Sequence, residues 1–235
     1  MHNRLIIVLL LVSAGLLSAC SQEKRNVLAI THVTVIDATG AAPRGDMTVM
    51  VEDDRIALVA AANTISLASN THVIDGTGKF LIPGLVDTHV HLTGAGEPDG
   101  SRQFMLPLLV ANGITTVRDM GGYLESLDPL RKEIREGKRT GPQIVFAGPY
   151  LDGNPPSFQP SLVVTNSADA TKYIDELVQR QVDFIKVQSI LNRDAYFAIA
   201  AECKRQHIPF VGHVPDRVTA AEASDAGQHL SLIHI

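Results

Sequence analysis

Two histidines placed two residues apart, His89 and His91, are the residues with the clearest capacity for chemistry. They lie in the apolar run 85–92, which follows a Pro-Gly turn. Successive side chains of a β-strand alternate between its two faces, so Asp87, His89 and His91 would share one face. A His-x-His pair alone is weak evidence for a metal site, because nine histidines in 235 residues can produce such a pair by chance. The strand context and the acidic neighbour favour a metal site.

The segment that must position these histidines alternates between strand-like and helix-like patterns. Amphipathic helical spacing separates the strands, and Thr219 with Glu222 forms a capping-box signature. Alternating β and α segments predict a parallel sheet, and their repetition favours an α/β fold of the (β/α)8 TIM type. The predicted strands are 85–92, 115–118, 143–147, 184–187 and 209–212.

Further candidate residues fall where these strands end. Lys186 lies near the end of the fourth strand and His213 just past the fifth. The carboxyl ends of barrel strands form one mouth, so both would face the two histidines. A lysine at a strand end is more often solvated, and a lone histidine more often a hydrogen-bonding residue, so the joint placement carries the argument. Candidate substrate contacts, each equally consistent with a structural role, are Arg118, Asp119, Tyr150 and Asp152.

Residues 21–83 predict a separate small β-sandwich domain. Short strand patterns between 26 and 80 are separated by turn residues. Gly76-Thr77-Gly78 is interpreted as a turn rather than a phosphate-binding loop, because no helix follows it. The partial barrel with the metal site is expected over 84–229.

The first twenty residues indicate an export signal. A short positive start, an apolar core and a Leu-Ser-Ala-Cys ending are typical of a signal peptide too short to span a membrane. The ending resembles the bacterial lipobox, which implies a lipid on Cys20 and attachment to the periplasmic side of the outer membrane. Ordinary cleavage and secretion is the alternative. With Cys20 lipidated, Cys203 would have no disulfide partner.

The composition fits a globular exported domain and argues against nucleic-acid binding. Hydrophobic residues make up 45% of the chain, and its formal net charge is −5. A nucleic-acid partner would require a basic face. The oligomeric state stays open.

Several motifs together resemble the metal-dependent amidohydrolase superfamily, and most closely its imidazolonepropionase-like and prolidase-type dipeptidase branch. The resemblance implies hydrolysis of amide-type C–N bonds in a small-molecule or dipeptide substrate, either a peptide or a cyclic amide. The motifs lie at 83–91, 113–122, 147–153, 183–187 and 209–215.

The same resemblance implies a centre of two divalent ions, zinc or manganese. His89 and His91 would bind one ion, His213 the second, and Lys186 would bridge both as a carbamate formed with carbon dioxide. An ammonium group is no metal ligand, but a neutral amine near cations can add carbon dioxide and become a carboxylate on a long arm. A water bound to such ions has a pKa near 7 rather than 15.7.

The C-terminal part departs from this family pattern. A barrel needs about 250 residues, whereas 152 follow Pro83. We therefore expect a barrel truncated after about strand 5 or 6, without the strand-8 aspartate that serves as general base. His234 is either a sixth-strand ligand or part of a non-native tail at 230–235, whose sequence resembles a transposase end used in library preparation. The genomic sequence of this segment decides between them.

These departures leave other functions open. As printed, the chain is expected to be inactive, so the hydrolase function belongs to the full-length protein. A non-catalytic metal- or ligand-binding lipoprotein on the same fold is the main alternative, and a lyase or isomerase that stabilises an enolate is another.

Overall fold

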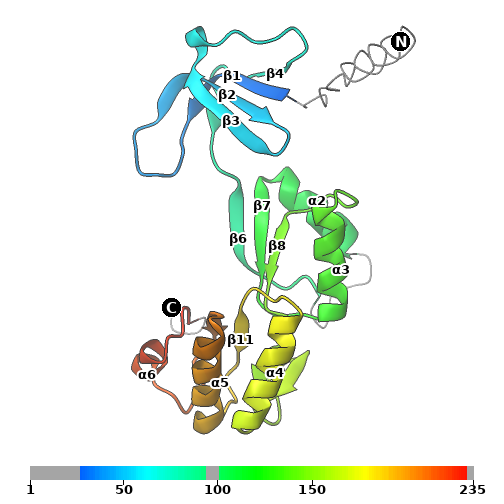
Figure 1. Cartoon of the computed structure of the whole chain (residues 1–235), viewed down its shortest axis with the longest axis vertical. Helices are drawn as coiled ribbons and strands as arrows, with labels where there is room; N and C mark the ends of the chain where they lie inside the picture. Colours follow the sequence, from blue (N-terminus) through cyan, green and yellow to red (C-terminus); the bar gives the residue numbers. More distant parts are fainter. Residues whose placement is uncertain (1–26, 94–100, 232–235) are drawn as a thin grey trace, which may run out of the picture. The chain divides into compact units, whose positions relative to one another are not determined.

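The computed structural model describes residues 27–93 and 101–231 (Figure 1). The chain divides into two compact units, residues 1–83 and residues 84–235. The export signal with Cys20 lies outside the described residues, as does His234. In the described part of the chain, no helix is long and apolar enough to cross a membrane.

The first unit is built on one mixed sheet of five strands, drawn in blue and cyan in Figure 1. Its order is β3-β2-β1-β4, and β5 also pairs with β1. The pairs β1–β2 and β2–β3 are antiparallel, whereas β4 and β5 run parallel to β1. The elements are β1 (Val27–Val35), β2 (Arg44–Glu52), β3 (Arg55–Ala61), η1 (Ala62–Thr64), β4 (His72–Asp75) and β5 (Phe80–Leu81).

The predicted two-sheet sandwich is not confirmed for residues 27–83. Strand β1 is irregular at His32, whose φ is 55°. Its first half pairs with β4 and its second half with β5, so both strands join one sheet. A small core of Val33, Val35, Met47 and Val49 lies on that sheet. Strand patterning reveals the buried positions but not the partner that each half of a strand takes.

The Gly76-Thr77-Gly78 segment forms a turn between β4 and β5. The Asp75 carboxylate accepts hydrogen bonds from the Thr77 backbone amide at 2.9 Å and from its hydroxyl at 2.7 Å. Gly78 has φ +72°, and a Cβ on Gly76 would lie 2.8 Å from the Val33 Cβ. The glycines therefore serve the turn and its close packing.

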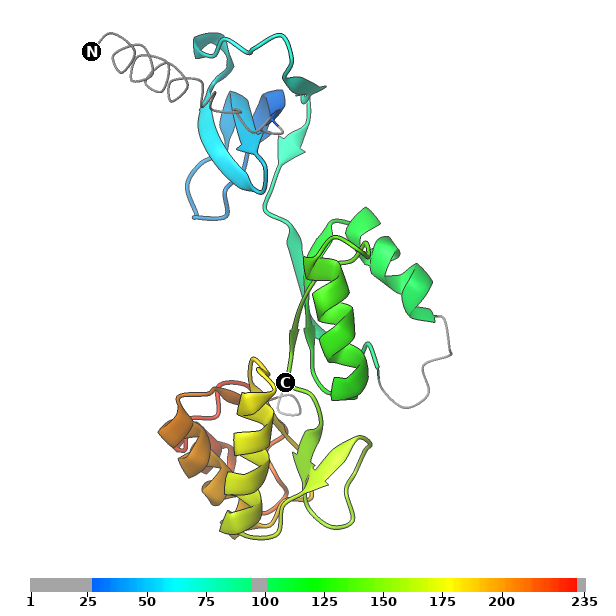
Figure 2. The same cartoon turned by 45° about the vertical axis from the view of Figure 1, so that its right-hand side comes forward.

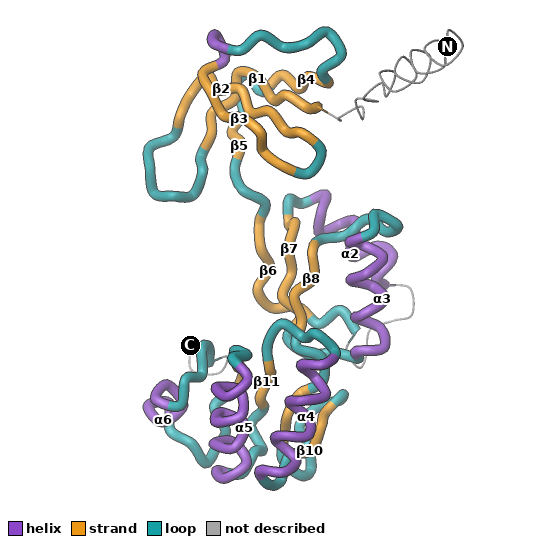
Figure 3. Tube along the Cα trace, viewed as in Figure 1, coloured by secondary structure: helices purple, strands orange, loops and turns teal. Residues whose placement is uncertain are grey.

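The second unit alternates strands and helices along the chain, which Figure 3 shows in orange and purple. All of its strand pairs are parallel. The elements are β6 (Leu85–Val90), α2 (Ser101–Ala111), β7 (Ile114–Asp119), α3 (Leu124–Arg135), β8 (Gln143–Phe146), β9 (Tyr150–Asp152), β10 (Ser161–Val163), α4 (Ser167–Gln179), β11 (Ile185–Val187), α5 (Arg193–Gln206), β12 (Phe210–Gly212) and α6 (Ala220–Asp225).

These strands form two sheets, with orders β6-β7-β8 and β10-β9-β11-β12. A bond from the Asp183 amide to the Phe146 carbonyl, 2.9 Å long, links the chain entering β11 to β8. A parallel bridge joins Ser231 to Gly212 of β12. Each of the five predicted strands of this unit overlaps an observed strand, whereas the short strands β9 and β10 were not predicted as such.

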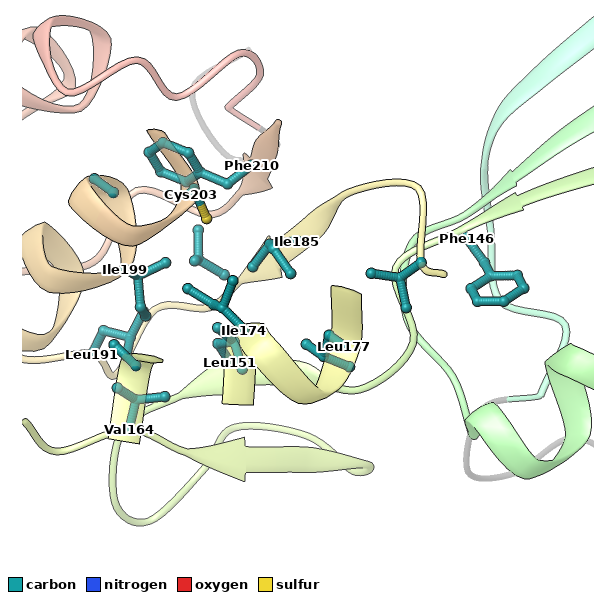
Figure 4. Packing of buried hydrophobic residues seen from close by; sticks show 14 of the residues in the cluster. Phe146, Leu151, Val164, Ile174, Leu177, Ile185, Leu191, Ile199, Cys203 and Phe210 are labelled. Atoms are coloured by element: carbon teal, nitrogen blue, oxygen red, sulfur yellow. The ribbon is translucent and has the colours of Figure 1, made fainter. Parts of the chain in front are cut away.

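Strands β8, β9, β11 and β12 are largely buried, whereas the edge strand β6 is mostly exposed. Helices α2 and α3 lie against one face of β6-β7-β8 (Figures 1 and 2). A large core fills the space between strands and helices, and Figure 4 shows part of it around Ile174, Leu177 and Ile185. The opposite face of the strands, called the inner face below, carries a smaller cluster of Met120, Ala147, Phe184 and Val211.

Local signals in the sequence correspond to observed helix ends. Thr219 and Glu222 form the predicted capping box at the start of α6. Gly137 and Gly227 have φ of +68° and +88° just beyond α3 and α6. Among the described residues Cys203 is a free cysteine, and its burial raises the pKa of its thiol to about 12.

We expect the large core between the strands and the helices, called the helix-side core below, to dominate the stability of the second unit. Leu177 is 2% exposed within this core, whereas Leu108 on α2 is 63% exposed. Leu177→Ala should lower the free energy of unfolding by about 2–5 kcal/mol, and the control Leu108→Ala should change it by less than about 0.5 kcal/mol. Urea unfolding followed by circular dichroism measures both. Equal losses would contradict this core assignment.

Candidate functional site

The candidate residues lie at the carboxyl ends of parallel strands. His89 is in β6, and His91 comes one residue after that strand. Lys186 is in β11, and His213 directly follows β12. Side chains alternate between the two faces of a strand, so Lys186 and His213 lie on the inner face. Their neighbours Val187 and Val214 lie on the opposite face, in the helix-side core. The structure therefore brings together four residues predicted from three separate segments.

His89 and His91 lie beside one another, with ring centroids 5.2 Å apart. Nδ1 of His91 is 3.0 Å from the Gly121 carbonyl oxygen. A proton on that nitrogen donates to the carbonyl and leaves Nε2 with a free electron pair. Metal-binding histidines are commonly fixed in this way by a hydrogen bond from the second ring nitrogen.

Lys186 is buried without a counter-ion among the described residues. Its side chain is 2% exposed, and its ammonium nitrogen has no hydrogen bond or ion pair in that part of the chain. The nitrogen lies 5.5 Å from the centroid of the Tyr150 ring. Burial, and then the positive charge of Arg118, lower the pKa of Lys186 to about 8. The amine is thus much closer to its neutral form than an ordinary lysine.

Electrostatics connect this lysine to two of the histidines. Burial and then the charge of Lys186 lower the pKa of His89. The same two causes, in the same order, lower the pKa of His213. Nδ1 of His213 is 2.9 Å from the Ser189 hydroxyl oxygen, which leaves its Nε2 available. Both imidazoles are therefore favoured in the neutral form that binds metals.

Asp119 connects the segments that follow β6 and β7. It is fully buried, and its two oxygens accept hydrogen bonds from the Leu92 amide at 2.6 Å and the Gly121 amide at 3.0 Å. Burial raises the pKa of Asp119 to about 6, against the lowering effect of these bonds. Asp119 thus holds the backbone of Leu92, next to His91, and that of Gly121, whose carbonyl bonds His91. Through both bonds Asp119 positions the His91 imidazole.

Asp152 has a similar role between two other loops. Its Oδ1 accepts bonds from the Gly153 and Ile190 amides at 2.9 and 3.0 Å, and its Oδ2 accepts one from the Ser157 amide at 2.6 Å. The side chain is fully buried. These oxygens are occupied by backbone amides, so a substrate contact by Asp152 stays a prediction.

Tyr150 and Arg118 stand beside the histidines and the lysine. The Tyr150 hydroxyl oxygen is 3.2 Å from Nδ1 of His91, and burial raises the pKa of Tyr150 to about 12, so the phenol stays protonated. Its ring covers Gly121, where a Cβ would lie 2.0 Å from a ring carbon. Arg118 donates from Nε to the Thr88 carbonyl at 2.8 Å.

Some positioning residues were missed by the sequence reasoning. Gly121 supplies both the carbonyl for His91 and the space for the Tyr150 ring. Ser189 bonds His213, and Thr93 accepts a bond from the Tyr123 amide at 2.8 Å. Their positions two or three residues after strand ends were the available signal, but small residues there are common in turns.

The donors suit a divalent transition metal, although they are not a complete ligand set. Among the described residues, no group of three or more His, Cys, Asp or Glu is placed to hold an ion. Neutral imidazoles with one fixed nitrogen, and a buried amine of low pKa, are nevertheless the chemistry such a metal requires. The fit therefore depends on Lys186 acting as a ligand in a modified form.

Comparison with curated proteins gives relatives that this chain matches in part. A 5′-deoxyadenosine deaminase from Methanothermobacter thermautotrophicus is 53% identical over 64 residues, which are 27% of this chain and 14% of that protein. An imidazolonepropionase from Idiomarina loihiensis is 24% identical over 194 residues, which cover 64% of this chain and 45% of that protein. The chain thus spans less than half the length of these relatives.

Solved structures share the fold. A putative prolidase from Bifidobacterium longum has a TM-score of 0.67 and 24% identity, covering 82% of this chain and 50% of that chain. The ochratoxinase of A. niger has a TM-score of 0.69 and 20% identity, covering 88% of this chain and 60% of that chain. The amidohydrolase family itself matches residues 80–231, the part that carries all of the site residues described above. The chain therefore belongs to the amidohydrolase family.

Proposed function

We propose that the complete protein is a metal-dependent hydrolase of amide-type C–N bonds. The single observation that carries this proposal is the buried Lys186 amine, which has no counter-ion among the described residues and lies among His89, His213 and Tyr150. A permanently charged lysine in this place would cost desolvation energy with no compensating partner. A neutral amine that can become a carbamate removes that cost.

Different residues on the inner face would bind each of the two ions. His89 and His91 would hold one ion, His213 the other, and Lys186 would bridge them as its carbamate. When bound, the ions supply a water of lowered pKa and polarise the scissile carbonyl. Asp119 holds the His91 loop, Ser189 holds His213, and the protonated Tyr150 can donate a hydrogen bond to the substrate.

The substrate is proposed to be a small molecule with an amide, peptide or cyclic-amide bond. Relatives named for deamination, imidazolone cleavage and prolidase activity act on C–N bonds, which supports this class without selecting one substrate.

We further propose that the barrel is closed in the complete protein. The edge strand β6 has Leu85 and Val86 at 50% and 56% exposure, which favours a further strand at that edge. An aspartate on the eighth strand of that barrel would be the general base. Export with a lipid on Cys20 remains part of the proposal and places the enzyme in the periplasm.

The test of this function is an assay of the complete gene product expressed without its signal. Zinc or manganese with bicarbonate should support hydrolysis in a panel of dipeptides and cyclic amides, and dialysis against a chelator should abolish it. Re-addition of metal should restore the rate. Activity that survives complete metal removal would contradict the mechanism, and binding without turnover across the panel would favour the non-catalytic alternative.

A pair of glycine substitutions tests the role of Tyr150. Gly121→Ala should displace the Tyr150 ring and lower kcat/KM about 100-fold, because a misplacement of about 1 Å has an effect of that size. Gly113 also has a positive φ, of +79°, but open space around it. The control Gly113→Ala should cost about 1–2 kcal/mol of stability and leave kcat/KM unchanged. Equal kinetic losses in both variants would show that backbone strain alone is responsible.

A further inference from the structure

Gln188 directly follows β11 and is 2% exposed. Its backbone amide donates to the Leu151 carbonyl at 3.0 Å, so the strand pairing continues through this residue. Alternation then puts its side chain on the inner face together with Lys186, one step closer to the carboxyl end of the strand. Ser189, the next residue, bonds His213. Gln188 is therefore enclosed within the candidate site.

The side-chain oxygen of Gln188 is buried and has no hydrogen-bond partner among the described residues. The other buried acceptors at this end of the strands are satisfied, since backbone amides bond Asp119, Asp152 and Thr93. A buried acceptor without a partner is rare and costs free energy, so it requires a partner that the described residues do not supply. Its place beside Lys186 makes the bound substrate the natural source of that partner.

We propose that the Gln188 carboxamide oxygen accepts a hydrogen bond from an N–H group of the substrate and so determines specificity. The inference rests on the proposed amide hydrolysis and deepens it. Secondary amides and N-unsubstituted ureides and lactams carry an N–H at the C–N bond, whereas esters and tertiary amides carry none. A site that presents a buried acceptor discriminates against ligands that lack the donor. Gln188 thus selects C–N bonds whose nitrogen bears a hydrogen.

The kinetic test uses Gln188→Met in the complete metal-loaded enzyme. Methionine preserves the length of the side chain and removes the acceptor. The probes are N-acetyl-L-alanine and N-acetyl-N-methyl-L-alanine, which differ in the amide hydrogen. The variant should lose about tenfold in kcat/KM on the secondary amide, the effect of one hydrogen bond, and show no change on the N-methyl compound. The control Gln179→Met, on the exposed end of α4, should change neither. Equal losses on both probes overturn the proposal.

A second measurement does not depend on turnover. Removing an acceptor that lacks a partner should leave the Tm of the metal-free protein unchanged or higher in Gln188→Met. A fall of about 2–4 °C or more would show that the oxygen already has an internal partner and would overturn the proposal. A wild-type enzyme that hydrolyses no C–N bond refutes the proposed function and this inference with it. An active wild type with equal losses, or with a lowered Tm in the variant, refutes the inference alone.

Discussion

The structure of the candidate site depends on one constraint, the enclosure of the Lys186 amine on the inner face without a counter-ion among the described residues. Burial and the neighbouring Arg118 both disfavour the charged form, and the charge that remains favours neutral imidazoles at His89 and His213. A set of neutral nitrogen donors results, which is what a metal centre needs.

Carboxylates close to the site do not neutralise that lysine, because they hold the backbone. Asp119 joins the chain after β6 to the loop after β7, and Asp152 joins the loops after β9 and β11. Each uses its oxygens on amide hydrogens that strand ends would otherwise leave without partners. These carboxylates therefore fix the loops, and neither of them pairs with Lys186 among the described residues.

The sequence predicted features that depend on local pattern. Alternating segments located the strands, and the spacing of Thr219 and Glu222 located the start of α6. The His-x-His pair located two neighbouring imidazoles at the end of β6. Features that depend on distant pairing escaped prediction. The expected sandwich is not confirmed, and the split pairing of β1 was not predicted. The isolation of the Gln188 oxygen appears only when its surroundings are folded. Local patterns can be recognised in the sequence, whereas the hydrogen-bond partner of a buried group depends on segments that meet only in the folded structure.

The central claim is that Lys186 is a neutral amine that becomes a carbamate, and carbon-13 NMR of the complete protein tests it most directly. Protein loaded with zinc and carbon-13 bicarbonate should show one protein-bound carbamate signal. That signal should be absent from Lys186→Ala and retained in Lys204→Ala, in which an exposed lysine of α5 is replaced. Absence of the signal from the wild type, or its persistence in Lys186→Ala, would contradict the account.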